Sequence, residues 1–324
     1  MQPFEYASPT ALKEALGLLG AEWTDANILA GGTDQISLMK EGLHHPKRVV
    51  NIKGIKELGG ISKTAAGLRI GATVTVDELM ENSLVRAEYP SLLQAARGIS
   101  SPQIRNMGTV AGDLCQRPRC WYYRNHLGLL AQRDGKSLVE QGQNEFHAIF
   151  HEGPAKFVSA SSFGPALIAL GATFTIASAS ATRKVEAAKF FTTPKARGER
   201  EKDLKPNEIL TEIVIPSARG VKNSTYEVRQ KEALDWPLAT ASVALKMKGN
   251  TVESAKVVLG HVGPTPVSAE KAAAMLAGKT ITEDTAAAAG QAAVEGAKPL
   301  SGNAYKVQLV SVSVKRALLA AVKA

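Results

Sequence analysis

Two turns built from small residues limit the possible folds most strongly. The first, AGGTD, covers residues 30–34 and lies between a strand-like stretch and a helix-like one. The second, GTVAG, covers residues 108–112 in a stretch that favours β-structure. Because glycine has no Cβ atom, backbone N–H groups in such turns can approach an anion closely, and Thr33 or Asp34 can cap the helix after the first turn. Two such turns suit a dinucleotide, whose diphosphate needs a binding loop on each side.

Each turn taken alone is also compatible with an ordinary corner in a core of small residues. The first turn matches neither the GxGxxG pattern of dinucleotide-binding folds nor a Walker loop. The occurrence of both turns in one half of the chain is therefore the informative observation.

The other secondary-structure signals predict an α+β fold, because the strands do not alternate strictly with long helices. The 324-residue chain is long enough for two or three domains. A hairpin is expected at Gly249-Asn250, and SARGVKNS (217–224) is expected to be a linker, which places a domain boundary near residue 220. Further predictions are helices at 10–20, 90–100 and after 268, strands at 27–29 and 208–216, and a helix followed by a strand at 164–178.

Charge and hydropathy exclude several function classes. The net charge is +9, but basic residues are spread along the chain without long runs, so a nucleic-acid partner is not expected. No stretch approaches 18 apolar residues, and the first ten residues lack the pattern of a secretory signal. We therefore expect no membrane span and a cytoplasmic location, with export alongside a signal-bearing partner left open.

Both cysteines of the chain, Cys115 and Cys120, lie in the segment AGDLCQRPRCWYYRN (111–125). A zinc site, a redox disulfide and a reactive thiol are all conceivable there. The spacing is neither CxxC nor that of a usual zinc site, even with His126, His147 or His151 as additional ligands. We therefore predict no bound metal.

The two turns in their wider context resemble a known family. ILAGGTDQISLMKEG and SPQIRNMGTVAGDLCQRPRCWYYRN resemble the FAD-binding medium subunit of the molybdenum hydroxylases, which include xanthine dehydrogenase, carbon monoxide dehydrogenase and aldehyde oxidoreductase. The resemblance extends to RIGATVTVDELMEN, ILTEIVIP and AKVVLGHVGPTPVSAEKAAAMLAGK. The segment QRPRCWYYRN is most similar to the bacterial aldehyde oxidoreductase type.

This resemblance implies a domain organisation. Residues 1–220 would form an FAD-binding domain of the vanillyl-alcohol oxidase (PCMH) type, with α+β subdomains at about 1–58 and 59–220. Residues 221–324 would form an α+β domain of the CO dehydrogenase flavoprotein C-terminal type.

The resemblance also implies the cofactor, FAD, and the residues that bind it. Ile99 and Leu210 would pack against the cofactor, and Trp121, Tyr122 and Tyr123 could shield the flavin ring or belong to the core. Asp235-Trp236 is expected to open a buried strand. No residue is expected to act as a general base or to bind metal. The first pyrophosphate loop would consist of Leu29, Ala30, Gly31, Gly32, Thr33, Asp34 and Gln35, and the second of Thr109, Val110, Ala111, Gly112 and Asp113.

The chain departs from the family pattern at two places. Ser162 stands where members of the family often have an aspartate that contacts the flavin side chain. Cys120 resembles the first ligand of a [4Fe–4S] cluster, but the following loop, roughly Trp121 to Ala155, contains no other cysteine. Such a cluster needs about four thiolates, so we predict that the loop is ordered by WYY packing and by arginine contacts to the flavin or a partner instead.

The function implied by the resemblance is electron transfer. A large subunit would oxidise a substrate at molybdenum, a small subunit would carry [2Fe–2S] clusters, and FAD in this chain would pass the electrons to an external acceptor. The competing hypothesis is a structural subunit that has lost its cofactor, which the Ser162 departure and the missing cysteines favour.

Overall fold

The N-terminal part of the chain folds around a small parallel sheet. The computed structural model describes residues 1–231 and 234–323. In this sheet β3 (Arg48–Asn51) lies between β1 (Glu5–Ala7) and β2 (Ala26–Leu29). Parallel neighbours require crossover connections, which α1 (Leu12–Gly17) and α2 (Gln35–Lys40) provide. The predicted order of strand, glycine turn and helix at 27–40 is confirmed.

A second, antiparallel sheet follows, with the strand order β4–β5–β10–β8–β9. Its central strand β10 (Ile209–Ile215) pairs with β5 (Gly67–Gly71) and β8 (Thr173–Ala177), which lie far away in the sequence. A cluster of apolar side chains fills the space between this sheet and its helices. The other elements of this part are η1 (Lys56–Leu58), β4 (Ile61–Thr64), α3 (Val76–Glu81), α4 (Ser83–Glu88), α5 (Pro90–Gly98), α6 (Pro102–Met107), α7 (Val110–Cys115), α8 (Phe163–Ala169), β9 (Thr182–Glu186) and α9 (Ala187–Phe190).

The C-terminal part is an antiparallel sheet with the order β11–β12–β13–β14. The hairpin predicted at Gly249-Asn250 joins β12 (Ala239–Lys248) to β13 (Thr251–Gly260). Helix α12 (Tyr305–Lys323) packs against β11 (Val221–Val228) and β12, whereas α5 and α8 contact the sheet from the preceding part. The remaining elements are β14 (Val267–Ser268), α10 (Glu270–Leu276) and α11 (Glu283–Ala293).

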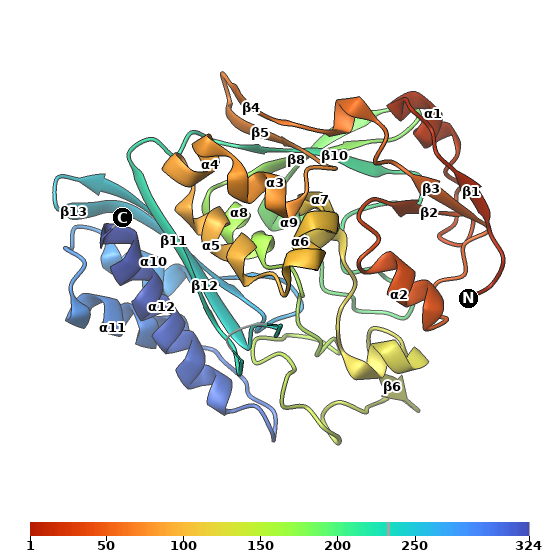
Figure 1. Ribbon diagram of the computed structural model, residues 1–324. Coiled ribbons are helices and arrows are strands. Elements are labelled where there is room, and N and C mark those ends of the chain that lie inside the picture. The colour runs from red at the N-terminus through yellow and green to blue at the C-terminus, as the bar shows by residue number, and fades with distance from the viewer. Residues whose placement is uncertain (232–233, 324) are drawn as a thin grey trace.

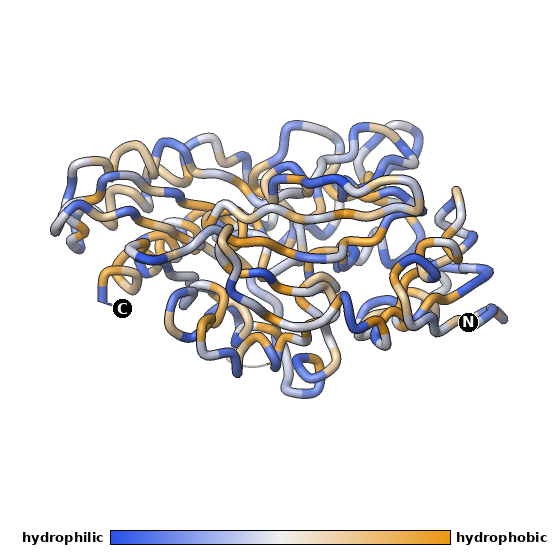
Figure 2. The backbone as a smooth tube through the Cα atoms, turned by 90° about the horizontal axis from the view of Figure 1, so that it is seen from above, coloured by the Kyte–Doolittle hydropathy of each residue, from blue (hydrophilic) through white to orange (hydrophobic). Residues whose placement is uncertain are grey.

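The long segment between α7 and α8 has little regular structure. It contains the one-turn helix η2 (Tyr123–Leu127) and a short hairpin of β6 (Gln132–Arg133) and β7 (Lys136–Ser137). The segment between α7 and α8 lies below the middle of the view in Figure 1. The two termini lie at opposite ends of the molecule in the same view. The view from above shows the same separation of the termini (Figure 2). Among the described residues no helix is long and apolar enough to cross a membrane.

Two predictions about local structure are wrong. The stretch around residues 102–115 is helical rather than β-like, because Ser101 and Thr109 accept hydrogen bonds from the first turns of α6 and α7 and act as caps. The expected linker at 217–224 instead enters β11, where Asn223 accepts a hydrogen bond from Ser91 N and donates one to Glu88 O. Turn-forming residue types obscured a strand that long-range pairing with β12 stabilises.

Candidate functional site

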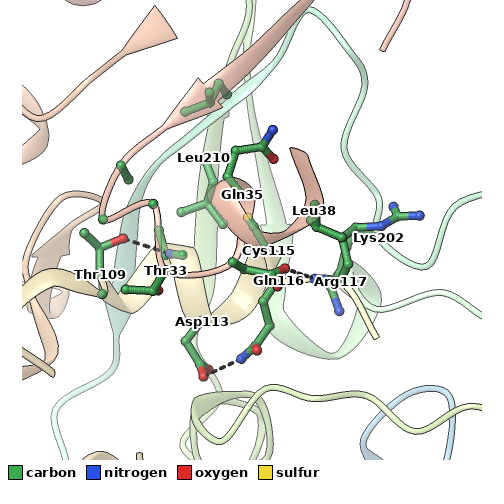
Figure 3. A pocket seen from close by; sticks show the side chains of 18 of the residues that line it. Thr33, Gln35, Leu38, Thr109, Asp113, Cys115, Gln116, Arg117, Lys202 and Leu210 are labelled. Carbon is green, nitrogen blue, oxygen red and sulfur yellow. Dashed lines mark hydrogen bonds between the residues drawn. The ribbon is translucent and has the colours of Figure 1, made fainter. Parts of the chain in front are cut away.

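A cavity of about 310 Å³ lies where the two glycine turns meet (Figure 3). Its wall includes residues from the end of β2, from the turn before α7, from β10 and from the segment before β12. Four parts of the sequence that are far apart therefore contribute to one site. Ile99, which directly follows α5, lines the cavity. Leu210, which lies in β10, also lines it.

The first turn approaches the second so closely that its glycines have no room for side chains. A Cβ atom on Gly31 would lie 1.9 Å from the Met107 carbonyl oxygen and 2.8 Å from the Gly108 Cα atom. Gly32 has a φ of +73°, a backbone conformation that favours glycine. The two turns thus expose backbone, rather than side chains, to the cavity.

The second turn is held to the rest of the domain by backbone hydrogen bonds. Val110 N donates to Val74 O, and Val76 N donates to Gly108 O. Thr109 Oγ1 accepts a hydrogen bond of 3.0 Å from Gly112 N and caps α7 (Figure 3). These contacts fix the turn against the start of α3 independently of any ligand.

The predicted site residues come together with two exceptions. Leu29 and Val110 do not line the cavity, and Val110 is buried in the apolar core behind α7. The predicted residues that line it are Ala30, Gly31, Gly32, Thr33, Asp34, Gln35, Ile99, Thr109, Ala111, Gly112, Asp113, Ser162 and Leu210.

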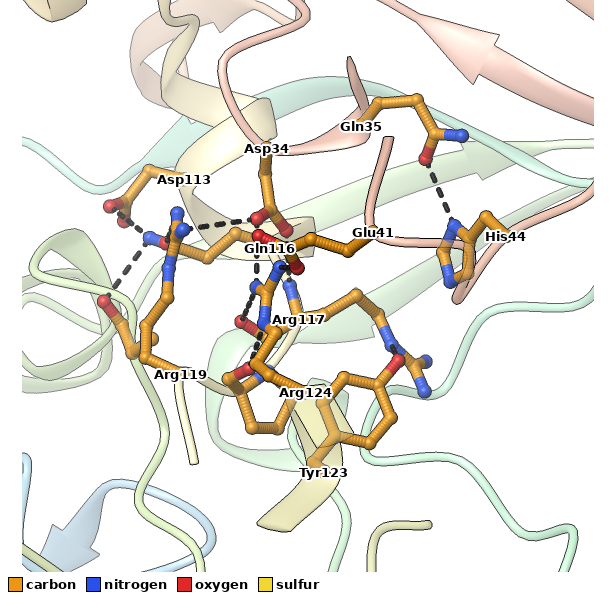
Figure 4. A network of polar contacts seen from close by, with 12 residues as sticks. Asp34, Gln35, Glu41, His44, Asp113, Gln116, Arg117, Arg119, Tyr123 and Arg124 are labelled. Atoms are coloured by element: carbon orange, nitrogen blue, oxygen red, sulfur yellow. Dashed lines mark hydrogen bonds and ion pairs between the residues drawn. The ribbon is translucent and has the colours of Figure 1, made fainter. Parts of the chain in front are cut away.

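Asp34 does not cap α2, contrary to expectation, because arginines bind its carboxylate (Figure 4). Its carboxylate oxygens accept a hydrogen bond of 2.9 Å from Arg117 N and form ion pairs of 3.2 Å with Arg119 and 2.8 Å with Arg124. Asp34 therefore ties the first turn to the segment that follows α7. These arginine contacts lie within the chain, whereas arginine contacts to the flavin or a partner stay a prediction.

Ser162 replaces an aspartate of the family pattern, but the carboxylate of Asp113 lies beside it. Asp113 accepts hydrogen bonds from Phe163 N (3.1 Å), Gln116 Nε2 (2.8 Å) and the Ser161 hydroxyl. Burial raises the pKa of Asp113, while the hydrogen bonds from Ser161 and Phe163 oppose that rise. Asp113 thereby joins the second turn to the beginning of α8, where Ser162 lines the cavity.

Basic side chains line the cavity together with acidic ones. The acidic residues on its wall are Asp34, Asp113, Glu201 and Asp235, and Glu201 forms an ion pair of 3.0 Å with Arg117. Arg117, Arg200 and Lys202 all line it. Burial and the charges of Arg117 and Arg200 lower the pKa of the neighbouring His44 to about 3. Arg200, whose guanidinium lies 4.0 Å from the centre of the Trp23 ring, has a pKa lowered to about 10 by burial and remains charged at neutral pH. The residues present therefore fit an anionic group such as a diphosphate.

Sequence reasoning missed Arg200 and Lys202. Both lie in the charged stretch GEREKDLKPNE (198–208), just before β10. Charge runs usually mark solvated surface, and nothing in that run indicates that Lys202 is partly buried, with its Nζ atom 4.4 Å from the centre of the Phe191 ring. Only the position of the run directly before the strand containing Leu210 could have pointed to the site.

The cysteines belong to two different environments. Cys115 lines the cavity, and burial raises its pKa to about 12, so it is a neutral thiol. Cys120 Sγ lies 3.1 Å from His147 Nε2. No group of three or more His, Cys, Asp or Glu residues that could hold a metal ion exists in the described ranges 1–231 and 234–323.

Aromatic residues near the site bear on two expectations. Trp121, Tyr122 and Tyr123 do not line this cavity and Tyr123 is buried, so of the two roles left open the structure shows packing within the chain. Trp121 packs edge-on against Phe146 with ring centres 5.7 Å apart, which orders the segment after α7. Trp236 does not open a buried strand: it precedes β12, is 41 % exposed and lines the cavity mouth, where Arg119 stacks on it at 4.6 Å.

Comparison with protein families matches almost the whole chain. Residues 2–218 match the FAD binding domain in molybdopterin dehydrogenase, and residues 224–321 match the CO dehydrogenase flavoprotein C-terminal domain. The carbon monoxide dehydrogenase medium chain of Hydrogenophaga pseudoflava is 31% identical over 322 residues, covering 98% of this chain and 96% of the relative. The aldehyde oxidoreductase FAD-binding subunit PaoB of Escherichia coli K12 is 29% identical over 315 residues, covering 95% of each chain.

Solved structures show the same architecture along the full length. A chain of quinoline 2-oxidoreductase from Pseudomonas putida 86 superimposes with a TM-score of 0.77 at 27% identity, covering 99% of this chain and 98% of that one. A chain of carbon monoxide dehydrogenase from H. pseudoflava gives a TM-score of 0.76 at 30% identity, covering 100% and 99%. The α+β fold implied by the sequence resemblance is thus confirmed. This chain belongs to the family of FAD-binding medium subunits of the molybdenum hydroxylases and is an FAD-dependent oxidoreductase subunit.

Proposed function

We propose that this chain uses FAD to pass electrons from the [2Fe–2S] clusters of a small partner subunit to an external acceptor. The substrate would be oxidised in a third, molybdenum-containing large subunit. The observation that carries the proposal is the meeting of two backbone-lined turns at a cavity that Arg200 and Lys202 also line. A dinucleotide needs this combination, because its diphosphate is bound by backbone N–H groups and compensated by cations.

Each part of the cavity has a proposed role toward the cofactor. Residues 29–35 and 109–113 would hold the diphosphate from two sides, with Leu29 and Val110 supporting their turns from behind. Ile99 and Leu210 would exclude water from the ring system, and Ser162 would bind the flavin side chain. Bound FAD supplies the redox chemistry, and the residues of this chain bind it, orient it and set its electrostatic surroundings.

The domain boundaries and the surroundings of the complex are also proposals. We place the FAD-binding domain at residues 1–220, with subdomains at about 1–58 and 59–220, and the C-terminal domain at 221–324. The change from the second sheet to the third sheet between β10 and β11 supports this division. We propose that the complex works in the cytoplasm and binds no nucleic acid.

Substitution of the turn glycines tests the site. Val at position 32 is strained by the positive φ, and a Cβ at position 112 would lie 2.8 Å from Thr109 Oγ1. Gly32→Val and Gly112→Val are each expected to abolish flavin retention in a chain whose circular dichroism is unchanged. Gly17→Val is the matched control, since a Cβ there meets nothing within 4 Å.

Electron transfer is tested in the assembled complex. Reduction of the [2Fe–2S] clusters should be followed by bleaching of the visible flavin absorbance, and the glycine variants should reduce the clusters without that second phase. Full flavin occupancy in both variants would show that these turns are not the site. A wild-type chain without flavin after reconstitution would favour the structural-subunit hypothesis.

A further inference from the structure

A carboxylate from the C-terminal sheet lies directly behind the wall of the cavity at the two glycine turns. Helix α5, whose last residue lines that cavity, packs against β11, the strand that carries Glu227 (Figure 1). A Cβ atom on Gly98, the last residue of α5, would lie 2.0 Å from Glu227 Oε2. Glu227 itself does not line the cavity, so it can act on a ligand there only through a neighbour.

One oxygen of this carboxylate is paired and the other lacks a close partner. The Glu227 side chain is 4 % exposed, and its Oε2 atom forms an ion pair of 2.6 Å with Arg229 Nη2. The Oε1 atom is buried and makes no hydrogen bond of good geometry among the described residues. A buried carboxylate oxygen without a donor is unfavourable, so a neighbouring O–H or N–H group is expected to bind it.

The Ser162 hydroxyl is the group that reaches Glu227 from the cavity wall. Its hydrogen bond lowers the pKa of Glu227, and Ser162 also lines the cavity. Because a carboxylate only accepts hydrogen bonds, the O–H bond of Ser162 points toward ionised Glu227. The lone pairs of Ser162 Oγ are then available to hydroxyl donors in the cavity.

The charge of Glu227 responds to groups on several elements. Burial, together with the charge of Asp113 on α7, raises the pKa of Glu227 to about 7 against the opposing effects of Arg229 and Ser162. The end of α5 and the start of α8 present Gly98 and Ser162, which carry no charge. Near neutral pH Glu227 therefore changes between a carboxylate, which only accepts, and a carboxylic acid, which can also donate to Ser162.

We propose that Glu227 is a positioning residue, which orients the Ser162 hydroxyl so that its oxygen accepts a hydrogen bond from the flavin side chain. The ribityl chain of FAD carries hydroxyl groups that can donate this bond. Glu227 thereby connects the C-terminal sheet to the orientation of the cofactor. The inference rests on the proposed function, which places the flavin side chain at Ser162.

The pH dependence of FAD affinity tests this role. The affinity of the full chain for FAD is measured by flavin fluorescence at pH 6, 7 and 8. Wild-type affinity should rise about three- to tenfold from pH 6 to pH 8, because ionised Glu227 orients Ser162 most strongly. Glu227→Gln keeps the shape without the titration, so it should match the wild type at pH 6 and show no rise. Glu253→Gln, an exposed carboxylate on β13, is the control and should keep the wild-type profile.

Ser162→Ala shows whether Glu227 acts through Ser162, and it remains informative if Glu227→Gln does not fold. This variant keeps the ion pair of Glu227 with Arg229, and its FAD affinity should be low and independent of pH from 6 to 8. The double variant should bind FAD no more weakly than Ser162→Ala alone, because the two residues act as one unit.

Three results would overturn the role of Glu227. The first is an equal pH profile in the wild type and Glu227→Gln, and the second is a rise of wild-type size in Ser162→Ala. The third is a full additional loss of affinity in the double variant, since Glu227 would then act on the cofactor by another route.

The outcome is distinguishable from a failure of the proposed function. A chain that retains FAD with the same pH profile in every variant contradicts the role of Glu227 alone. A wild-type chain that retains no FAD at any of the three pH values contradicts the proposed function, and with it this role.

Discussion

Replacement of Asp113 is expected to weaken both the fold and flavin binding. The carboxylate accepts hydrogen bonds from Ser161, Phe163 N and Gln116, and so connects the second turn to α8. Asp113→Ala leaves these donors without their acceptor. An unpaired buried donor costs about 1–3 kcal/mol, and because the site is partly exposed we expect a total loss of about 2–4 kcal/mol.

Asp113→Asn separates the charge from the shape of the side chain. The amide keeps one acceptor oxygen, so the free energy of unfolding should fall by only about 1–2 kcal/mol. Urea denaturation monitored by circular dichroism gives these values, and flavin fluorescence after reconstitution gives the affinity for FAD. Asp284→Ala, on the exposed first turn of α11, is the control. If Asp113→Ala lost less than about 1 kcal/mol and kept its flavin, the role assigned to this carboxylate would be refuted.

Three further predictions concern other parts of the molecule. His44, His147 and His261 stay neutral in the folded chain but protonate near pH 6.5 when unfolded, so the free energy of unfolding should fall by about 3–4 kcal/mol from pH 6 to pH 5; urea denaturation at both pH values checks this, and an equal slope in His147→Asn would contradict it. The double variant Cys115→Ser with Cys120→Ser should keep the flavin spectrum, and its free energy of unfolding should fall by only about 1–2 kcal/mol. Iron analysis of anaerobically purified wild-type protein should find no [4Fe–4S] cluster, and four irons per chain that disappear in the double variant would contradict this. Gly290→Val should lower the melting temperature measured by calorimetry, because a Cβ there would lie 2.4 Å from Ser311 O between α11 and α12; an unchanged melting temperature would contradict that packing.

The sequence predicted the elements whose local signals agree with their tertiary surroundings. Two examples are the turn at Gly31 and Gly32 between β2 and α2 and the hairpin at Gly249-Asn250. The residue types at both places strongly favour a turn over other conformations. Sequence alone could not predict β11, because Asn223 and its neighbours are turn-forming types that become a strand only by pairing with β12.

The candidate site was predictable in its backbone but less so in its charges. Both turns were identified from small residues, since close approach of the backbone demands them. The helix cap suggested for Asp34 was wrong, because the arginines that bind its carboxylate come from a segment more than 80 residues away. Lys202 escaped prediction because its burial depends on the packing of Phe191 from the end of α9.

The most direct test of the account is to identify the cofactor that this chain retains. The full chain is reconstituted separately with FAD and with FMN, freed of unbound flavin, and heated, and the released flavin is identified by chromatography. We predict one FAD per chain and no retained FMN, because two backbone-lined turns at one cavity suit a diphosphate with a group on each side. Retention of FMN, or of neither flavin, would contradict the central claim.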